Sequence, residues 1–375
     1  MKRVAIVRLS ALGDVIISAS FLGFLGEIKK AFLTHKGETL RIEWFIDKRF
    51  ADILVDSPVI DCLHVLDFKK NLRSISGLLS LKKYCKNCGE YDVVLDLQGL
   101  IKSGIVTKML DSKEFIGFSF KSARESLASF FYSKKIHISY HANILERNFK
   151  LIIESIKILE PENGHSNLLQ SDLKTALRLR KNGFSYNKNT LDSTLFKILE
   201  NKCYRILFVL EASIKEKIYP AKQFIELARK INTLDSINTT FFLTFKDNID
   251  SANEIFNALK LENIECIKLH NLDFNSLKYM LSNMNCAIGG DTGLTYLAWA
   301  LGVPTISLYG NKDSKNTESK DSKKNKKSSK NMRNTELSRI LLGNPYLVSQ
   351  SDNFEIESIS PNDIFNVFKN EILKI

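Results

Sequence analysis

The chain has 375 residues, of which 44% are hydrophobic and only six are proline, a composition typical of a folded protein with more than one small core. No apolar run reaches the roughly 20 residues that a membrane-spanning helix needs, and Arg8 and Asp14 interrupt what would otherwise be a signal-peptide core, so we expect a cytoplasmic protein. The net charge of +12 indicates an anionic partner without identifying it.

In the N-terminal half, apolar strand patterns alternate with helical patterns, which predicts an α/β domain with a parallel sheet. The predicted strands are residues 4–9, 41–46, 62–68, 91–97 and 114–118, with helices over 15–32 and 72–85. The first strand ends in the loop RLSALGD at 8–14, which leads into a helix. Ligands of open parallel sheets bind beyond the carboxyl ends of the strands, which places Asp14 at the mouth of a crevice. The alternative is that Asp14 only caps its helix.

Basic residues follow other strands of this half. Lys102 lies in the segment DLQGLIKSG at 96–104, Arg124 in SARESLAS at 122–129, and Lys69, Lys70 and Arg73 form a cluster after the third strand. An arginine fork fits a phosphate or carboxylate bidentately, so these side chains are candidates for an anionic ligand. Each of them alone is more often an ordinary surface charge.

A second α/β domain is predicted after the polar stretch 182–189. Its expected strands are residues 204–210, 239–244, 265–269, 285–289 and 305–309, and a final helix over 361–373 begins with Ser360 as its cap and Pro361 in its first turn. We therefore divide the chain into residues 1–181, residues 182–360 and a C-terminal helix at 361–375.

The most informative stretch is GGDTGLTYLAWALGVPTISLYG at 289–310, which predicts a strand, a Gly-rich turn, a short helix and another strand. Two glycines let the backbone approach a ligand, and the amides of Thr292, Gly293 and Leu294 would present N–H groups to an anion. Asp291 can hold a sugar hydroxyl. The plainer interpretation is an ordinary helix cap.

Residues 311–333 hold nine basic residues against three acidic ones, half of the net charge of the whole chain. This Lys-, Ser- and Asn-rich composition predicts a disordered insertion, either a solvated loop or a contact with anionic lipid headgroups. No nucleic-acid-binding pattern accompanies the charge, so nucleic acid is not expected as a partner. Cys85 and Cys88 form a C-x-x-C pair, but no second pair or nearby His completes a zinc site, and we predict no metal.

These segments resemble those of one family. The stretch at 289–310 is similar to GGDTGLxHLAxALGxPxxxLYG of the lipopolysaccharide heptosyltransferases of glycosyltransferase family 9, in particular the heptosyltransferase I branch. The loop at 8–15 resembles the N-terminal motif of the family, and DLQGLIKS and the segments at 122–129 and 141–148 match further family segments. The likeness covers nearly the whole chain apart from the Lys-rich insertion. Tyr296 stands where the family usually has His, and Asn248 stands near a family Glu that holds the nucleotide ribose.

The resemblance implies a GT-B fold, with two facing Rossmann-like domains, parallel sheets and an interdomain cleft. It implies transfer of L-glycero-D-manno-heptose from its ADP-activated form to the Kdo of the lipid A inner core, with inversion and without a metal or other cofactor. Asp14 would be the general base, and Lys217 would meet the donor phosphates. The implied site residues for the donor are Ser213, Lys217, Gly290, Asp291, Thr292, Gly293 and Leu294, and those for the acceptor are Gly13, Lys69, Lys70, Arg73, Lys102 and Arg124.

Three alternatives stay open from the sequence. The chain can be heptosyltransferase II or another core glycosyltransferase with a heptose acceptor, although the Gly-Gly-Asp-Thr-Gly form and the Leu-Gly-Asp start favour the first enzyme. It can be a nucleotide-sugar epimerase or hydrolase, whose release of nucleotide would not depend on an acceptor. It can also be a noncatalytic anion-binding module, which would bind without turnover. The expected location is the cytoplasmic face of the inner membrane, as a peripheral protein on its anionic surface.

Overall fold

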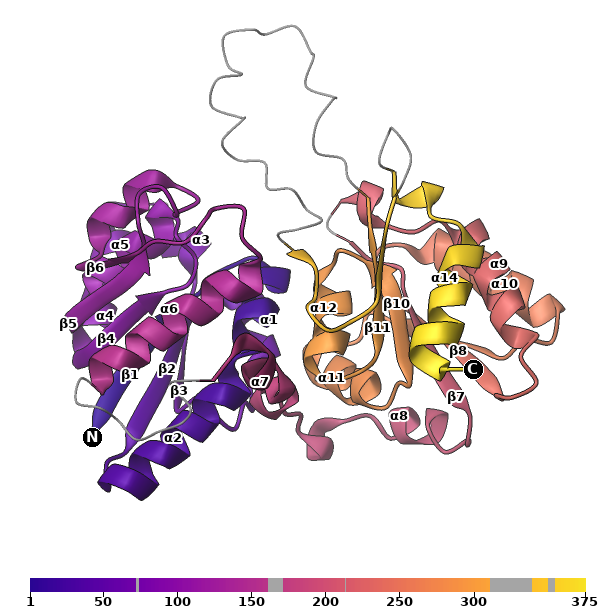
Figure 1. The fold of residues 1–375 in the computed structure, drawn as a ribbon, viewed down its shortest axis with the longest axis horizontal. Coiled ribbons are helices and arrows are strands. Elements are labelled where there is room, and N and C mark those ends of the chain that lie inside the picture. Colours follow the sequence, from indigo (N-terminus) through magenta and orange to yellow (C-terminus); the bar gives the residue numbers. More distant parts are fainter. Residues whose placement is uncertain (72–73, 161–170, 213, 311–338, 350–354) are drawn as a thin grey trace, which may run out of the picture. The chain divides into compact units, whose positions relative to one another are not determined.

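Two six-stranded sheets, each in its own unit, make up the fold (Figure 1). The structure is a computed structural model that describes the chain except for residues 72–73, 161–170, 213, 311–338 and 350–354. Unit 1 comprises Met1–Ser185 and unit 2 comprises Tyr186–Ile375. Every pair of neighbouring strands is parallel, which confirms the predicted α/β class.

Unit 1 has the strand order β3-β2-β1-β4-β5-β6. Its strands are β1 Lys2–Val7, β2 Leu40–Asp47, β3 Cys62–Leu66, β4 Glu90–Asp96, β5 Asp111–Phe118 and β6 Lys134–Ile136. Its helices are α1 Leu12–Ala19, α2 Leu22–Lys36, α3 Phe68–Asn71, α4 Ile75–Asn87, α5 Ile101–Met109, α6 Ile144–Leu159 and α7 Leu173–Arg178, with short 3₁₀ helices that include η1 Lys48–Ile53 and η2 Ser126–Phe131.

Helices cover both faces of this sheet, and consecutive residues of its central strands are therefore buried. Val4, Ala5, Ile6 and Val7 of β1 are all buried, as expected for a strand that packs on two sides. Figure 1 shows α1, α2 and α6 on one face and α4 and α5 on the other. Strand order reverses between β1 and β4, and ligands of open parallel sheets bind beyond the carboxyl ends of the strands at such a reversal.

Unit 2 repeats the same order, β9-β8-β7-β10-β11-β12. Its strands are β7 Tyr204–Val209, β8 Thr239–Phe245, β9 Cys266–His270, β10 Cys286–Gly290, β11 Thr305–Tyr309 and β12 Tyr346–Val348. Its helices are α8 Ser193–Ile198, α9 Ala221–Asn232, α10 Ile249–Leu261, α11 Phe274–Ser282, α12 Gly293–Ala300 and α14 Pro361–Val367, with the 3₁₀ turn η6 Lys215–Lys217 and a final π-helical turn η8 Phe368–Leu373.

The core of unit 2 lies between its sheet and the helices α9, α10 and α14, with α11 and α12 on the opposite face (Figure 1). Ile364 and Phe368 of the C-terminal segment are fully buried in this core, and the Ser360 side chain accepts a hydrogen bond from the Asp363 amide, as the Ser-Pro start predicted. Among the described residues, none of the helices has the length and apolar character that crossing a bilayer requires.

Two differences from the predicted elements concern short or interrupted segments. The sequence prediction missed β6 and β12, which have three residues each and lie at sheet edges. The helix predicted over 15–32 is two helices, because the chain breaks at Ser20, whose hydroxyl donates to the Ile17 carbonyl oxygen (2.7 Å). The Lys-rich insertion predicted at 311–333 lies outside the described residues.

Candidate functional site

In unit 1, an ion pair lies at the carboxyl end of β1. Arg8 follows β1 and is almost fully buried, and its Nη2 lies 2.9 Å from Oδ2 of Asp14 in the first turn of α1. The Arg8 Nη1 donates to the Leu97 carbonyl oxygen at the end of β4, so the guanidinium bridges the two strands where the sheet order reverses. Asp14 therefore lies just beyond the carboxyl end of β1, where the strand order reverses. No role was predicted for Arg8 from the sequence.

The loop after β4 is fixed by a buried carboxylate. Asp96 accepts hydrogen bonds from the amides of Gln98 (2.7 Å) and Gly99 (3.1 Å) and from the Tyr132 hydroxyl (2.8 Å). Gly99 has a φ of +67°, a backbone conformation that favours glycine. These contacts explain why the DLQG sequence makes a tight turn at this edge of the sheet.

Two side chains from this turn contact the loop that precedes Asp14. The Gln98 Oε1 accepts from the Leu9 amide (2.9 Å), and its Nε2 donates to the Ser10 hydroxyl (3.2 Å). The Lys102 Nζ donates to the same hydroxyl (2.7 Å). Burial lowers the pKa of Lys102, and the charges of Arg49 and Arg8 add to this against the opposing effect of Asp47. Lys102 thus contacts the loop that precedes Asp14, near the charges of Arg8 and Arg49.

The other predicted acceptor residues of unit 1 are arranged less closely. Gly13 precedes Asp14 in α1. Lys69 and Lys70 in α3 and Arg124 before η2 are exposed, and the contacts seen in the described part of the chain do not join their side chains to Asp14. All three follow strands at the same carboxyl edge. Arg73 lies outside the described residues.

Unit 2 has an equivalent reversal of strand order, between β7 and β10. Gly290 ends β10 and packs against the loop after β7, since a Cβ added to it would lie 2.0 Å from the Lys217 carbonyl oxygen. The Lys217 Nζ contacts Oδ2 of Asp291 and lies 3.4 Å from the Asp291 carbonyl oxygen. The loops after the two strands thus bring Lys217 and Asp291 together, across 74 positions of sequence.

One of the two carboxylate oxygens of Asp291 has no hydrogen-bond donor among the described residues. The residue is 7% exposed, Oδ2 is paired with Lys217, and Oδ1 has no hydrogen-bond partner among the described residues. A buried carboxylate oxygen without a donor costs free energy, on the order of 1–3 kcal/mol for a buried polar group and more for a charged one. A ligand hydroxyl would supply the missing donor.

Helix α12 begins directly after Asp291. Thr292 is its N-cap in an extended conformation, and the Thr292 side chain does not cap the helix. The amides of Gly293 and Leu294 are in the first turn, where an α-helix has no internal carbonyl partners for them. The prediction for the Thr292 amide was wrong: it donates to the Gly290 carbonyl oxygen (2.8 Å), because the chain turns tightly there. The start of α12 is thus a positive helix end beside a lysine.

The loops after β7 and β8 are linked by two polar side chains. The Glu211 Oε2 accepts from the amides of Lys246 (2.8 Å) and Asp247 (2.9 Å), and the Asn248 Nδ2 donates to the Leu210 carbonyl oxygen (2.9 Å). Asn248, which stands near the family's ribose-binding Glu, therefore holds the protein's own backbone. Ser213 lies outside the described residues.

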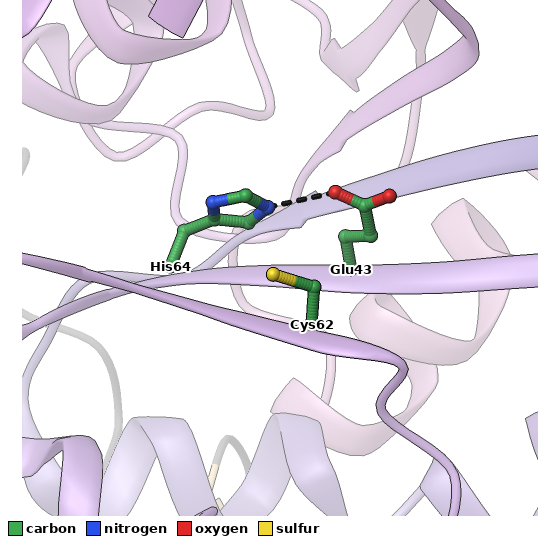
Figure 2. A group of neighbouring side chains, drawn as sticks. All are labelled: Glu43, Cys62 and His64. Carbon is green, nitrogen blue, oxygen red and sulfur yellow. Dashed lines mark hydrogen bonds and ion pairs between the residues drawn. The ribbon is translucent and has the colours of Figure 1, made fainter. Parts of the chain in front are cut away.

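A third polar group lies within the sheet of unit 1, on β2 and β3. Figure 2 shows Glu43, Cys62 and His64 on the neighbouring strands β2 and β3, with ligand-type atoms within 4.8 Å of one another. His64 also lies 3.8 Å from the Cys88 Sγ, so the statement that no His is near the C-x-x-C pair was wrong. Sequence reasoning missed this because His64 comes from a different strand.

The charges around this group favour a hydrogen-bonded network over a metal centre. Glu43 Oε1 is paired with the guanidinium groups of Arg3 (2.7 Å) and Arg41 (2.8 Å). Glu43 Oε2 accepts from the Tyr91 hydroxyl (2.7 Å) and lies 2.7 Å from the His64 Nε2. A metal ion here would have to displace these hydrogen bonds beside two fixed positive charges.

Comparisons with known proteins agree with this arrangement. A family model described as "Glycosyltransferase family 9 (heptosyltransferase)" matches residues 78–340. Lipopolysaccharide heptosyltransferase 1 of Campylobacter coli is 32% identical over 317 residues, which cover 82% of this chain and 84% of that protein. Lipopolysaccharide heptosyltransferase 1 of Pseudomonas aeruginosa is 26% identical, with 82% of this chain and 78% of that protein covered.

Solved structures give the same result for the fold. Escherichia coli heptosyltransferase WaaC with ADP-2-deoxy-2-fluoro heptose matches with a TM-score of 0.68 at 19% identity, covering 98% of this chain and 99% of that chain. A glycosyl transferase of family 9 from Veillonella parvula matches with a TM-score of 0.70 at 17% identity, covering 100% and 98%. At these identities the likeness concerns the fold, and it confirms the predicted GT-B class.

Proposed function

The chain belongs to glycosyltransferase family 9, the heptosyltransferases, and we propose that it transfers L-glycero-D-manno-heptose from ADP-heptose to the Kdo of the lipid A inner core, with inversion at the anomeric carbon. Unit 2 would bind the nucleotide sugar and unit 1 the acceptor. The role of each residue below belongs to this proposal.

The observation that carries the proposal is the group formed by Lys217, Asp291 and the start of α12. A diphosphate needs positive charge, which the Lys217 ammonium and the Gly293 and Leu294 amides supply. A sugar needs a hydrogen-bond acceptor for its hydroxyls, which the unpartnered Asp291 Oδ1 supplies. A sugar diphosphate satisfies both requirements within one turn.

Lys217 would also assist the chemical step. When the bond between the sugar and the diphosphate breaks, negative charge grows on the leaving phosphate oxygen. A lysine ammonium and helix amides already held in place stabilise that charge without having to reorient. We therefore expect no metal or other cofactor in the reaction.

Asp14 would be the general base in unit 1. A carboxylate at the crevice mouth can accept the proton of the acceptor hydroxyl as that oxygen attacks the anomeric carbon. The buried Arg8 guanidinium, 2.9 Å away, holds the Asp14 carboxylate in one orientation. Lys102, and with it Gly13, would lie closest to the acceptor, and Lys69, Lys70, Arg73 and Arg124 would meet its carboxylate and phosphate groups.

The acceptor is a lipid, so we expect the protein to work as a peripheral protein on the cytoplasmic face of the inner membrane. Its net charge of +12 suits an anionic membrane surface. The Lys-rich residues 311–333, which lie outside the described residues, are one candidate for that contact.

Mass spectrometry of an incubation with ADP-heptose and Kdo-lipid A tests the function. We expect the mass of the acceptor to increase by one heptose residue and ADP to appear in equal amount. Transfer only to an acceptor that already carries heptose would indicate heptosyltransferase II instead. Release of ADP or a changed nucleotide sugar without any acceptor would indicate a hydrolase or an epimerase, and ADP binding with no product in any arm would indicate a noncatalytic module.

A further inference from the structure

Three large apolar side chains of unit 1 are exposed in the segment that follows β5. Asp14 likewise follows the carboxyl end of a strand of this sheet, β1. The three side chains are Phe120 (48% exposed), Leu127 (56%) and Phe130 (69%), which we call the apolar patch. The rings of Phe120 and Phe130 have centroids 6.1 Å apart. Leu127 and Phe130 are three residues apart in the 3₁₀ helix η2, where such a spacing places two side chains on the same side. The patch is therefore contiguous.

The backbone under the patch is firmly held. Ala128 and Ser129 of η2 are buried, and the ring of Phe131 packs so closely on Gly104 of α5 that an added Cβ would lie 2.4 Å from it. The Glu125 amide donates to the Gly99 carbonyl oxygen (3.1 Å). Because this segment has a well-packed inner side, its apolar residues on the outer side are not explained by local looseness, and they indicate a binding surface.

Positive charge surrounds the patch. Lys121, Arg124 and Lys135 are exposed, and we call them the basic rim. The Lys135 Nζ lies 5.9 Å from the centre of the Phe130 ring. The nearby acid Glu125 accepts a hydrogen bond from the Ile101 amide (2.6 Å). Aromatic side chains surrounded by lysines and an arginine suit the interface of an anionic bilayer. There the aromatic rings can enter the headgroup region while the cationic groups reach the lipid phosphates.

The size of the patch also favours a membrane over a protein partner. A stable protein interface buries about 800 Å² on each partner and engages roughly 20–30 residues a side. Three apolar side chains and three cationic ones fall far short of this. A bilayer needs no matching surface and binds through a few inserted rings together with charge.

The patch is joined to the proposed acceptor residues by direct contacts within unit 1. Glu125, at the start of η2, binds the Ile101 amide, and the next residue, Lys102, donates to the Ser10 hydroxyl in the Asp14 loop. We propose that the apolar patch and the basic rim insert into the headgroup region of an anionic bilayer and so bring the Asp14 loop to a membrane-borne acceptor. The approach to an acceptor rests on the proposed function, whereas the insertion into the bilayer does not.

The test is co-sedimentation of the full chain with phosphatidylcholine vesicles that do or do not contain phosphatidylglycerol. Phe120→Ala combined with Phe130→Ala should lower binding to the anionic vesicles about tenfold or more, because buried apolar area is lost. This loss should persist in 1 M salt, where the Debye length is about 3 Å. Lys121→Glu combined with Lys135→Glu should weaken binding at low salt and little at high salt. Leu261→Ala and Lys222→Glu, at exposed positions of unit 2, are the matched controls.

Wild-type binding by the Phe120→Ala, Phe130→Ala variant, checked to melt at the wild-type temperature, would overturn the proposal. So would a loss no larger than that caused by the controls, or a concentration-dependent dimer in solution that the same variant abolishes, since a second copy would then cover the patch. A second readout uses the enzyme reaction: the variant should keep its rate on an acyl-free acceptor and lose rate on a vesicle-borne one. If the wild type transfers no heptose at all, the proposed function fails while the vesicle result still decides the insertion.

Discussion

At the residue scale, each unit holds a carboxylate and a cation as an ion pair at the carboxyl edge of its sheet, but the more exposed partner differs between the units. In unit 1 the Arg8 side chain is 4% exposed and that of Asp14 is 13% exposed. In unit 2 the Asp291 side chain is 5% exposed and that of Lys217 is 33% exposed. The more accessible member is thus a proton acceptor in unit 1 and a cation in unit 2. These are the charges that an acceptor hydroxyl and a donor diphosphate require.

Replacing Asp14 by Asn tests the base. The amide keeps the size of the side chain and much of its hydrogen bonding but cannot take the proton, so turnover should fall about 10²-fold or more while ADP-heptose binding stays near wild type. Steady-state kinetics and a binding titration measure the two effects. Asp52→Asn, at an exposed position in η1, is the control. Near-normal turnover of Asp14→Asn would remove Asp14 from the mechanism.

Replacing Lys217 by Ala tests the cation. If the Lys217 interaction strengthens as charge grows on the leaving group, the variant should lose more in turnover than in ADP affinity. Lys215→Ala removes an exposed lysine from the same 3₁₀ turn and should have little effect. EDTA should leave the wild-type rate unchanged. A strict requirement for a divalent ion, or equal losses in the two lysine variants, would contradict this role.

At the element scale, the turn between β10 and α12 depends on the absence of a side chain at Gly290. A Cβ there would lie 2.0 Å from the Lys217 carbonyl oxygen, which is backbone and cannot move alone. Gly290→Ala should therefore push the η6 turn away from α12, with a loss of stability of roughly 1–3 kcal/mol and weaker ADP binding. Gly26→Ala is the control, since its Cβ would meet only the methyl groups of Val59, at 3.2 and 4.0 Å. Calorimetry with and without ADP separates the two effects.

The Glu43 network between β2 and β3 should make unit 1 sensitive to acid (Figure 2). Burial alone would raise the pKa of Glu43, but hydrogen bonds from His64, Arg3 and Tyr91 outweigh it and lower the pKa from 4.5 to about 2. A lowered pKa in the folded state gives stability above the unfolded pKa that is lost as pH falls through the folded one. The loss should thus occur between about pH 4.5 and pH 2 and amount to about 3 kcal/mol.

Glu43→Gln should remove most of this pH dependence and destabilise unit 1 near neutral pH, because Arg3 and Arg41 lose their counter-charge. The chain has two tryptophans, Trp44 in β2 and Trp299 in α12. In a Trp299→Phe background, urea unfolding followed by Trp44 fluorescence reports on unit 1. Glu254→Gln, at an exposed position of α10, should leave the profile unchanged. A variant with the pH profile of the wild type would show that Glu43 does not carry the acid sensitivity.

Sequence patterns predicted the long elements because burial repeats along them. Each of the central strands β1, β4, β7 and β10 contains an apolar run with a charged residue within two positions of its carboxyl end, and each was expected within two residues of its observed bounds. The edge strands β6 and β12 were missed because three residues make no recognisable pattern. The missed contacts are those that only the fold creates, such as His64 beside Cys88 and Arg8 bridging Asp14 to Leu97. For the contacts of Arg8, the sequence signal was the arginine itself, in the loop RLSALGD at 8–14.

At the scale of the whole molecule, the two units share one strand order, and each places its candidate residues where that order reverses. The reversal leaves diverging loops whose backbone groups are not used by the sheet, so a ligand can reach them. The order of the strands cannot be derived from the sequence pattern alone, because the pattern is the same for any parallel arrangement. The loop motifs at 8–14 and 289–294 were expected after strands, and they follow the carboxyl ends of β1 and β10.

The Lys-rich insertion gives a prediction for the whole chain. Its flanks lie close together, since the Tyr309 hydroxyl at the end of β11 donates to the Arg339 carbonyl oxygen (3.2 Å), so a short connection can replace it. If residues 313–331 form a disordered loop, as their composition predicts, deleting them should leave the melting temperature and the rate on a soluble acceptor almost unchanged, because loop length alters closure entropy only slightly. If the lysines touch the membrane, binding to anionic vesicles should weaken at low salt and change little at high salt. The deletion should thus reduce the electrostatic part of vesicle binding, whereas the Phe120 and Phe130 substitutions reduce the apolar part. A large drop in melting temperature would show that these residues belong to the fold of unit 2.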